Sequence, residues 1–360
     1  MRVLFIQGGF GTGGAEKIVA MIANHRAAHG DQVEVAGMRA PRDGSYYRYS
    51  PDVTLHVLEP NVPASEPVSQ IKRLKMLRKL IRDRKPDVVV SFLTKINVLT
   101  LTAGLGTGIP IVISERNNPR AQNNHPLWHT ASMTLSRRAT SVVTLTERGR
   151  DQLPAKVRHR TRVIPNPCVP IEGARAQING AASQLVAVGR LDWQKGFDLL
   201  LHAVARLRDS HPTLSLTIFG EGPERKALEG LRADLGLEAT VAMPGTTQRH
   251  GAWVSEADIL VVTSRYEGFC NVVAEATLSG VPIISFDCEF GPREMIRHEV
   301  NGLLVQTGDI DGMADNLSRL INDTQLRARM SAASYLNVEY LDPDRILKSW
   351  DAVINDAVEV

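Results

Sequence analysis

The sequence predicts an α/β protein made of two doubly wound domains, each built on a parallel β-sheet. The chain has 360 residues, more than one hydrophobic core usually supports. Short apolar runs alternate with amphipathic segments along almost its whole length, which is typical of β-α-β units. Three prolines in the stretch RVIPNPCVP interrupt this alternation near the middle. We therefore expect domains at 1–165 and 183–342, a linker at 166–182, and a last helix at 343–360 that packs back on the first domain.

The strand predictions come from continuous apolar runs, because parallel strands are buried on both faces of the sheet. The helix predictions come from apolar stripes at helical spacing, such as Leu200, Val204 and Leu207 within 197–209. The predicted strands are 3–7, 32–37, 53–58, 87–92, 109–114 and 141–144 in the first domain, and 184–188, 214–219, 240–243, 259–263, 282–286 and 303–305 in the second.

Composition excludes several classes of protein. The chain is 43% hydrophobic and 22% charged, as in ordinary globular proteins. Cys168, Cys270 and Cys288 lie too far apart for a Cys-x-x-Cys pair, so neither a disulfide framework nor a thiolate zinc site is indicated. The apolar start is too short for a secretory leader, and no apolar run approaches the roughly 18 residues that cross a bilayer. We expect a cytoplasmic protein.

The charge is unevenly distributed along the chain. Residues 1–180 hold 26 Lys and Arg against 13 Asp and Glu, whereas residues 181–360 hold 16 against 26. The basic half can attract nucleic acid, an anionic membrane or a phosphorylated substrate. An incidental bias of the solvated surface is the alternative.

Three segments carry residues suited to binding a phosphorylated ligand. The first strand runs into GGFGTGGAEK at 8–17, a turn that brings backbone amides to a helix N-terminus, although a plain turn is an equal alternative. Arg190 and Lys195 follow the first strand of the second domain. Two cations beside a helix N-terminus suit a diphosphate, and this interpretation is favoured over a pair of solvated loop residues. Glu267 precedes a helix that starts near Asn271, and this helix carries Glu275 in its first turns. Because apolar residues surround Glu275, an idle charge there would be costly.

With these motifs in place, the chain resembles the retaining glycosyltransferases of family 4, which have the GT-B architecture of two Rossmann-like domains facing a cleft. The resemblance covers nearly the whole length and rests on GRLDWQKG at 189–196, on Glu267 and Glu275 with seven residues between them, on SGVPII after them, and on GGAEK near the start. It implies that Arg190 and Lys195 bind the diphosphate of a nucleotide-sugar donor, that Glu267 contacts the donor sugar, and that Glu275 holds the ribose. The remaining donor-binding candidates are Gly13, Gly14, Gly268, Phe269, Cys270, Asn271 and Val272.

The chemistry implied is transfer of a sugar from a nucleoside diphosphate with retained anomeric configuration. Negative charge develops on the leaving diphosphate, and Arg190, Lys195 and the helix N-terminus at Asn271 would stabilise it, so no metal is expected. Arg190, Lys195 and Glu267 are the catalytic candidates, with Glu267 as a positioning residue rather than a nucleophile. UDP is favoured over GDP on family frequency alone.

The sequence departs from the family after the fifth strand. Many members have a His where this chain reads VISERNNP, with Arg116 at about that position. A catalytic His role is therefore not carried over, and Glu115, Arg116 and Asn117 are candidates for the acceptor side, against the alternative of a loop held by local hydrogen bonds. Relatives with this loop build capsule, O-antigen and lipid-linked glycans, which indicates a glycan or polyprenyl-linked acceptor.

A basic amphipathic segment at 71–85 indicates where in the cell the protein acts. Its lysines and arginines can lie on the anionic inner face of the cytoplasmic membrane, while its apolar stripe equally suits packing on a sheet. A module that binds an anionic surface or nucleic acid is one alternative function, although at 5% aromatic content no nucleic-acid partner is expected. A nucleotide-sugar epimerase or a glycosyl phosphorylase is the other.

Overall fold

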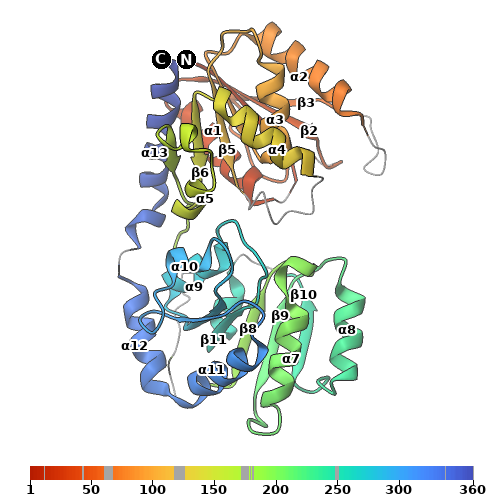
Figure 1. Ribbon diagram of the computed structural model, residues 1–360, viewed down its shortest axis with the longest axis vertical. Helices are drawn as coiled ribbons and strands as arrows, with labels where there is room; N and C mark the ends of the chain where they lie inside the picture. Colours follow the sequence, from red (N-terminus) through yellow and green to blue (C-terminus); the bar gives the residue numbers. More distant parts are fainter. Residues whose placement is uncertain are drawn as a thin grey trace. The chain divides into compact units, whose positions relative to one another are not determined.

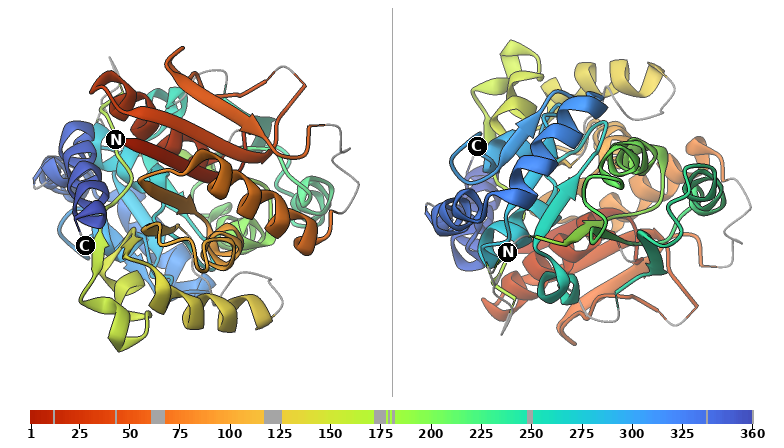
Figure 2. Two further views of the ribbon diagram at one scale, coloured as in Figure 1. Left: turned by 90° about the horizontal axis from the view of Figure 1, so that it is seen from above. Right: turned by 90° about the horizontal axis from the view of Figure 1, so that it is seen from below.

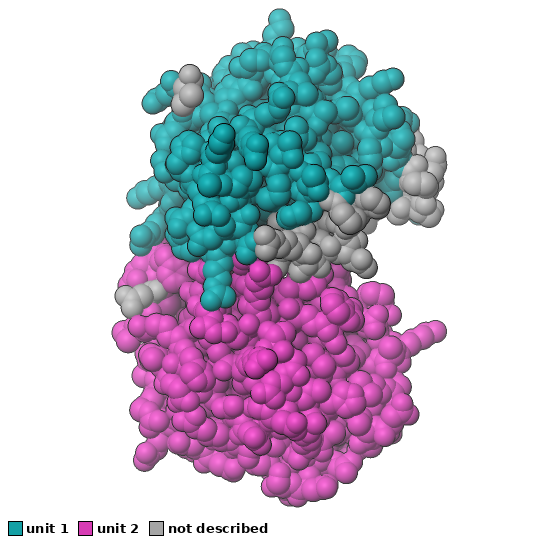
Figure 3. Space-filling model, viewed as in Figure 1, with its two compact units in different colours: residues 1–166, 344–360 teal, residues 167–343 magenta. Residues whose placement is uncertain are grey.

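The computed structural model describes residues 1–11, 13–42, 44–60, 68–116, 126–171, 178, 180, 182–247, 251–336 and 338–359. The chain divides into two compact units (Figure 3). Unit 1 consists of Met1–Asn166 together with Asp344–Val360, and unit 2 consists of Pro167–Pro343. Each unit has its own sheet and its own core, which confirms the predicted fold class of two parallel-sheet, Rossmann-like domains.

Unit 1 is built on a seven-stranded parallel sheet in the order β3-β2-β1-β4-β5-β6-β7. The six strands predicted from the sequence are present, and the structure adds β7. That strand is only three residues long and lies close to Pro165, so it gives no apolar run to recognise. The strands are β1 (Arg2–Gly9), β2 (Gln32–Arg39), β3 (Val53–Val57), β4 (Val88–Phe92), β5 (Ile111–Glu115), β6 (Ser141–Thr144) and β7 (Thr161–Val163).

Helices cover both faces of this sheet (Figures 1 and 2). Alternate residues of β1 point to opposite sides: Val3 and Phe5 join one core cluster, and Leu4 and Ile6 join the other. The C-terminal helix α13 contributes Trp350 to the Val3 side, so the last helix belongs to unit 1. The helices are α1 (Gly14–Ala28), α2 (Gln70–Arg84), α3 (Thr94–Ala103), α4 (Pro126–Leu135), α5 (Glu147–Asp151), α6 (Ala155–Arg158) and α13 (Pro343–Val358).

Unit 2 is built on a six-stranded parallel sheet in the order β10-β9-β8-β11-β12-β13. The sequence predicts all six strands. They are β8 (Gln184–Val188), β9 (Ser215–Phe219), β10 (Val241–Gly245), β11 (Ile259–Val262), β12 (Ile283–Phe286) and β13 (Leu303–Val305). The helices are α7 (Phe197–Leu207), α8 (Arg225–Asp234), α9 (Asn271–Ser279), α10 (Pro292–Met295), α11 (Ile310–Asn322) and α12 (Thr324–Ser334), with short 3-10 turns at Trp193–Lys195, Ala252–Glu256 and Glu339–Leu341.

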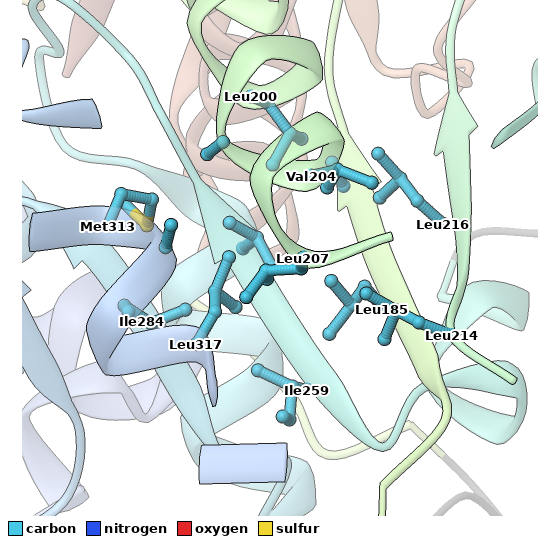
Figure 4. Packing of buried hydrophobic residues seen from close by; sticks show 14 of the residues in the cluster. Leu185, Leu200, Val204, Leu207, Leu214, Leu216, Ile259, Ile284, Met313 and Leu317 are labelled. Atoms are coloured by element: carbon cyan, nitrogen blue, oxygen red, sulfur yellow. The ribbon is translucent and has the colours of Figure 1, made fainter. Parts of the chain in front are cut away.

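The core of unit 2 forms where α7 and α11 pack side by side on one face of this sheet (Figure 4). Leu200 and Val204 of α7, Leu317 of α11 and the strand residues Leu216 and Ile284 belong to one cluster, and all five are fully buried. Each such side chain contributes about 1.5–3 kcal/mol when it leaves water. This packing fixes the sheet from which the functional loops extend.

In each sheet the order of successive strands reverses at one point. In unit 2 the neighbours β8 and β11 lie at that point, and in unit 1 the neighbours are β1 and β4. The loops that leave the carboxyl ends of such neighbours diverge to opposite faces, which leaves room for a ligand between them. The motif at 189–196 follows β8, and the segment that contains Glu267 follows β11. The fold therefore brings these two sequence motifs to the same edge of one sheet.

Candidate donor-binding site

Lys195 and Glu267 form a salt bridge at the carboxyl edge of the unit 2 sheet. Lys195 Nζ donates to Glu267 Oε1 at 2.6 Å, and Ser264 Oγ donates to the same oxygen at 2.6 Å. Burial disfavours the charged ammonium, but the interactions with Glu267 and with further acidic groups around it together outweigh this effect, so the pKa of Lys195 is raised. The pair thus presents a permanent cation and an anchored carboxylate in one place.

A glycine allows the Lys195 loop to approach β11 closely. Gly196 has a φ of 63°, and a Cβ there would lie 2.2 Å from the carbonyl oxygen of Thr263. Thr263 Oγ1 in turn donates to the carbonyl oxygen of Lys195 at 3.1 Å. Any other residue at position 196 would push these two loops apart, so this glycine sets the distance between Lys195 and Glu267.

Arg190 lies in the same loop and is mostly exposed. Its Nε donates to Asp192 Oδ2 at 2.6 Å, and 71% of its side chain is accessible. The sequence grouped Arg190 with Lys195 as one cationic pair. In the structure each has its own carboxylate partner, and Arg190 is the one that solvent reaches.

Trp193 and Arg265 form a second link between the two loops. The Arg265 guanidinium lies over the Trp193 ring at 4.7 Å from its centroid and is held by Asp198 through hydrogen bonds of 2.9 and 2.6 Å. Gln194 Nε2 donates to the Tyr266 carbonyl oxygen at 2.9 Å. These contacts hold the loop after β8 against the loop after β11.

Helix α9 begins at this edge without a side-chain cap. Its N-cap residue, Cys270, has a φ of 71°, and its side chain makes no capping hydrogen bond. Uncapped helix N-termini favour anions through their backbone amides. Burial raises the pKa of Cys270 and that of Cys288, the latter to about 12, so both thiols stay protonated at neutral pH. Phe269 is buried, and Asn271 and Val272 begin the helix.

Glu275 lies deeper in α9 and contacts a residue that the sequence analysis missed. Trp253 donates from Nε1 to Glu275 Oε2 at 3.1 Å, and both side chains are buried. Ser264 beside Glu267 was missed as well. Ser264 is three positions from Glu267 and offered a local signal, whereas Trp253 is twenty-two positions from Glu275 and gave none.

In unit 1 the glycine-rich turn closes around an acidic side chain. Gly13 is the N-cap of α1, and a Cβ on it would lie 2.1 Å from Glu16 Oε2. Burial raises the pKa of Glu16, against a smaller lowering by a backbone hydrogen bond. Burial also raises the pKa of Tyr49 to about 12, although a hydrogen bond from Gln7 opposes this shift. The turn therefore has a carboxylate of its own at the helix N-terminus, and Gly14 begins the helix.

The acceptor-side candidates lie at the carboxyl end of β5 in unit 1. Glu115 and Arg116 are both buried, and Glu115 Oε1 accepts a hydrogen bond of 2.6 Å from Thr94 Oγ1. Arg116 donates to Asn166 Oδ1 and lies over the Phe92 ring at 5.7 Å from its centroid. Burial lowers the pKa of Arg116 to about 9. Asn117 lies outside the described residues.

Neither a metal site nor a membrane span is found in the part of the chain that the structure describes. No cluster of three or more His, Cys, Asp or Glu side chains is arranged to hold a metal ion there. Two Asp-x-Asp sequences, at 309–311 and 342–344, lie elsewhere: Asp309 caps α11, and Asp311 pairs with Arg206. Within the same residues no helix has the length and apolar character to cross a bilayer.

Comparison with known proteins agrees with this geometry. Residues 13–167 match the model of the glycosyl transferase 4-like domain, and residues 172–336 match that of glycosyl transferases group 1. Together the two matches cover most of the chain, which therefore belongs to the glycosyltransferases of the GT-B type. The predicted family is confirmed.

Similar proteins act on bacterial glycans. An exopolysaccharide phosphotransferase of Streptomyces coelicolor is 29% identical over 78% of this chain, which spans only 30% of that protein's length. An α-1,4-N-acetyl-D-galactosaminyltransferase of Campylobacter jejuni, named for a GalNAc-containing undecaprenol diphosphate glycan, is 25% identical over 97% of both chains. The crystal structure of Anabaena HepE with UDP and glucose has a TM-score of 0.80 at 20% identity and covers 99% of both chains, which shows the shared fold.

Proposed function

We propose that this protein is a retaining, metal-independent hexosyltransferase that moves a sugar from a nucleoside diphosphate sugar to a glycan acceptor. The observation that carries the proposal is the Lys195–Glu267 salt bridge beside the uncapped N-terminus of α9. A cation and a helix N-terminus suit the diphosphate, and an anchored carboxylate suits the sugar hydroxyls. All three lie at the switch point of the unit 2 sheet, where open α/β sheets bind their ligands.

In this proposal Lys195 and Arg190 neutralise the charge that develops on the leaving diphosphate. Arg190 is exposed and turns from Asp192 to the phosphates, whereas Lys195 is fixed by Glu267. The amides from Gly268 through Phe269 and Cys270 to Val272 add hydrogen bonds, and Glu275 takes the ribose. Because these donors are already oriented, the leaving group is stabilised without a divalent metal.

UDP is the proposed donor nucleotide and a lipid-linked or polysaccharide precursor the proposed acceptor. The structure with UDP and glucose among the neighbours supports the first assignment, and the relative named for an undecaprenol diphosphate glycan supports the second. Gly13 and Gly14 are also assigned to donor binding, and Glu115, Arg116 and Asn117 to the acceptor.

The basic helix α2 is proposed to bring the protein to the anionic inner face of the cytoplasmic membrane. Lys72, Lys75, Arg82 and Lys85 are exposed, and their side chains make no ion pair or hydrogen bond with other described residues. Ile71, with 68% of its surface exposed, lies beside them. At about 1 kcal/mol for each basic residue near such a surface, four residues give reversible binding.

An NMR assay of donor hydrolysis tests the reaction. The full-length protein is incubated with UDP-hexoses and UDP-N-acetylhexosamines, with and without EDTA, and the anomer released first is read from its proton signal. We expect slow release of the α-anomer, unaffected by EDTA. Lys195→Ala should reduce the rate by about 10²–10³-fold, while the exposed Lys226→Ala serves as control. Release of the β-anomer first, or a requirement for added metal, would contradict the proposal.

A further inference from the structure

Arg116 differs from the other buried arginines in what compensates its charge. Arg26, Arg116 and Arg327 are the arginines buried in the described part of the chain, with 6%, 6% and 1% of their surface exposed. Arg26 pairs with Asp31 and Asp351. Arg327 donates to the carbonyl oxygens of Leu320 and Ile321 at the end of α11, where the helix dipole is negative. Arg116 has neither kind of partner among the described residues.

Among the described residues, the polar groups that hydrogen-bond to the Arg116 guanidinium are neutral. Its Nη1 reaches Ser114 Oγ at 3.5 Å, its Nη2 donates to the amide oxygen of Asn166, and its Nε–H makes no hydrogen bond within the described residues. Residues 117–125, which follow it in the sequence, contain no Asp or Glu. A buried charge is normally paired, because removing it from water otherwise costs several kcal/mol. Burial of the Arg116 guanidinium carries this cost.

Aromatic packing holds Arg116 in a fixed orientation. The guanidinium lies over one face of Phe92, and the Phe92 ring stacks on Trp350 of α13 at 5.4 Å between centroids. Three parts of unit 1 converge on this side chain. Phe92 lies at the carboxyl end of β4, Ser114 lies at that of β5, and Asn166 lies in the segment after β7. A buried cation that is held in one orientation, with no carboxylate partner among the described residues, is arranged to receive an anionic ligand.

We propose that Arg116 is the centre of an oxyanion subsite in unit 1, and that its ligand is an anionic group of the acceptor. This inference rests on the proposed function, because it places the acceptor in unit 1. The oxyanion is either a phosphate, as in a lipid-linked diphosphate, or the carboxylate of an acidic sugar. Both fit the planar fork of a guanidinium, and the anion would supply the counter-charge that the described residues do not provide.

The test measures anion binding with the proposed donor cations removed. In full-length protein carrying Arg190→Ala and Lys195→Ala, calorimetry at physiological ionic strength follows the binding of inorganic pyrophosphate, methyl phosphate and glucuronate. Adding Arg116→Gln should weaken binding of the preferred anion by about 10-fold to 100-fold, the range expected for lost charge-assisted hydrogen bonds. Arg116→Lys, which keeps the charge and loses the fork, should fall between the parent protein and Arg116→Gln.

Arg26→Gln is the matched control, since it removes a buried arginine of unit 1 whose charge is already paired. It should lower the Tm and leave anion binding unchanged. Preference for the phosphates identifies a phosphorylated acceptor, and preference for glucuronate identifies an acidic sugar. The inference is overturned if the parent protein binds none of the three anions, if Arg116→Gln binds them as well as the parent does, or if Arg26→Gln weakens binding equally. UDP binding by the wild-type protein tests the proposed function separately.

Discussion

At the scale of residues, the two carboxylates of the donor motif have separate surroundings. Glu267 accepts hydrogen bonds from Lys195 and Ser264, where the loops after β8 and β11 meet. Glu275 accepts from the Trp253 indole within α9. Because they share no partner among these contacts, their substitutions should have distinguishable effects.

Glu275→Ala and Glu267→Ala should therefore fail in different ways. Loss of the proposed ribose contact in Glu275→Ala should weaken UDP binding by about 10-fold, as expected for a lost charged hydrogen bond. Glu267→Ala leaves Lys195 free for the diphosphate, so it should keep UDP affinity and lose turnover. Calorimetry with UDP and the rate of UDP-sugar hydrolysis measure the two effects, with the exposed Glu238→Ala as control. Equal UDP affinity in wild type and Glu275→Ala would rule out this division of roles.

The residues that the sequence identified are those that lie within a local motif. Arg190, Lys195, Glu267 and Glu275 could be found because each has a fixed spacing to glycines and to a helix start. Their tertiary partners could not be found. Trp253 reaches Glu275, and Asn166 reaches Arg116, across separations of twenty-two and fifty residues that leave no pattern in the sequence. The position of these side chains at one edge of the unit 2 sheet was predictable, and the contacts that orient them were not.

At the scale of elements, helix α2 packs its apolar side chains on the sheet and exposes basic side chains to solvent. Its Leu77 and Ile81 are fully buried against the sheet, and Ser69 caps its first turn by accepting from Lys72 N at 3.2 Å. Its basic side chains differ in their surroundings. Arg73 pairs with the buried Glu59, whereas others face solvent. The sequence predicted the helix and its charge, but which arginine anchors it depends on Glu59, which comes from another segment.

The exposed basic residues of α2 should govern membrane binding. Lys72→Glu, Lys75→Glu and Arg82→Glu together should abolish sedimentation with vesicles that contain phosphatidylserine, because each reversal replaces an attraction of about 1 kcal/mol with a repulsion. The same change in net charge at Arg137, Arg138 and Lys156, which are also exposed in unit 1, is the control and should have a much smaller effect. Equal loss in both triple variants would mean that overall charge, and not α2, drives the binding.

The Glu59 cluster should make stability depend on acid pH. Hydrogen bonds from Arg73, opposed by burial and helped by Arg39, lower the pKa of Glu59 below its ordinary value of 4.5. A lowered folded-state pKa adds stability above the unfolded value, and that stability is lost as the pH falls through the folded value. Thermal unfolding of Glu59→Gln should therefore show a lower Tm at pH 7 and a smaller further drop between pH 5 and pH 3 than wild type. Parallel curves would show that Glu59 does not titrate with unfolding.

At the scale of the whole molecule, the charge asymmetry follows the division of labour that we propose. The basic half supplies unit 1 with α2 and Arg116, and the acidic half forms most of unit 2, where Arg190 and Lys195 lie at the donor loop. The last helix returns to unit 1, where Trp350 stacks on Phe92. The two parallel sheets were within reach of the sequence, because the apolar runs predicted their strands. The three-residue β7 was not, because its formation depends on pairing with β6.

The most direct measurement of the central claim is a calorimetric panel of UDP, GDP and ADP with wild-type protein and Arg190→Ala, each with and without EDTA. We expect UDP to bind in preference to the other two, EDTA to leave its affinity unchanged, and Arg190→Ala to weaken it by about 10-fold or more. No binding of any nucleotide, or UDP binding that EDTA abolishes, would contradict a metal-independent donor site built on Lys195, Arg190 and the N-terminus of α9.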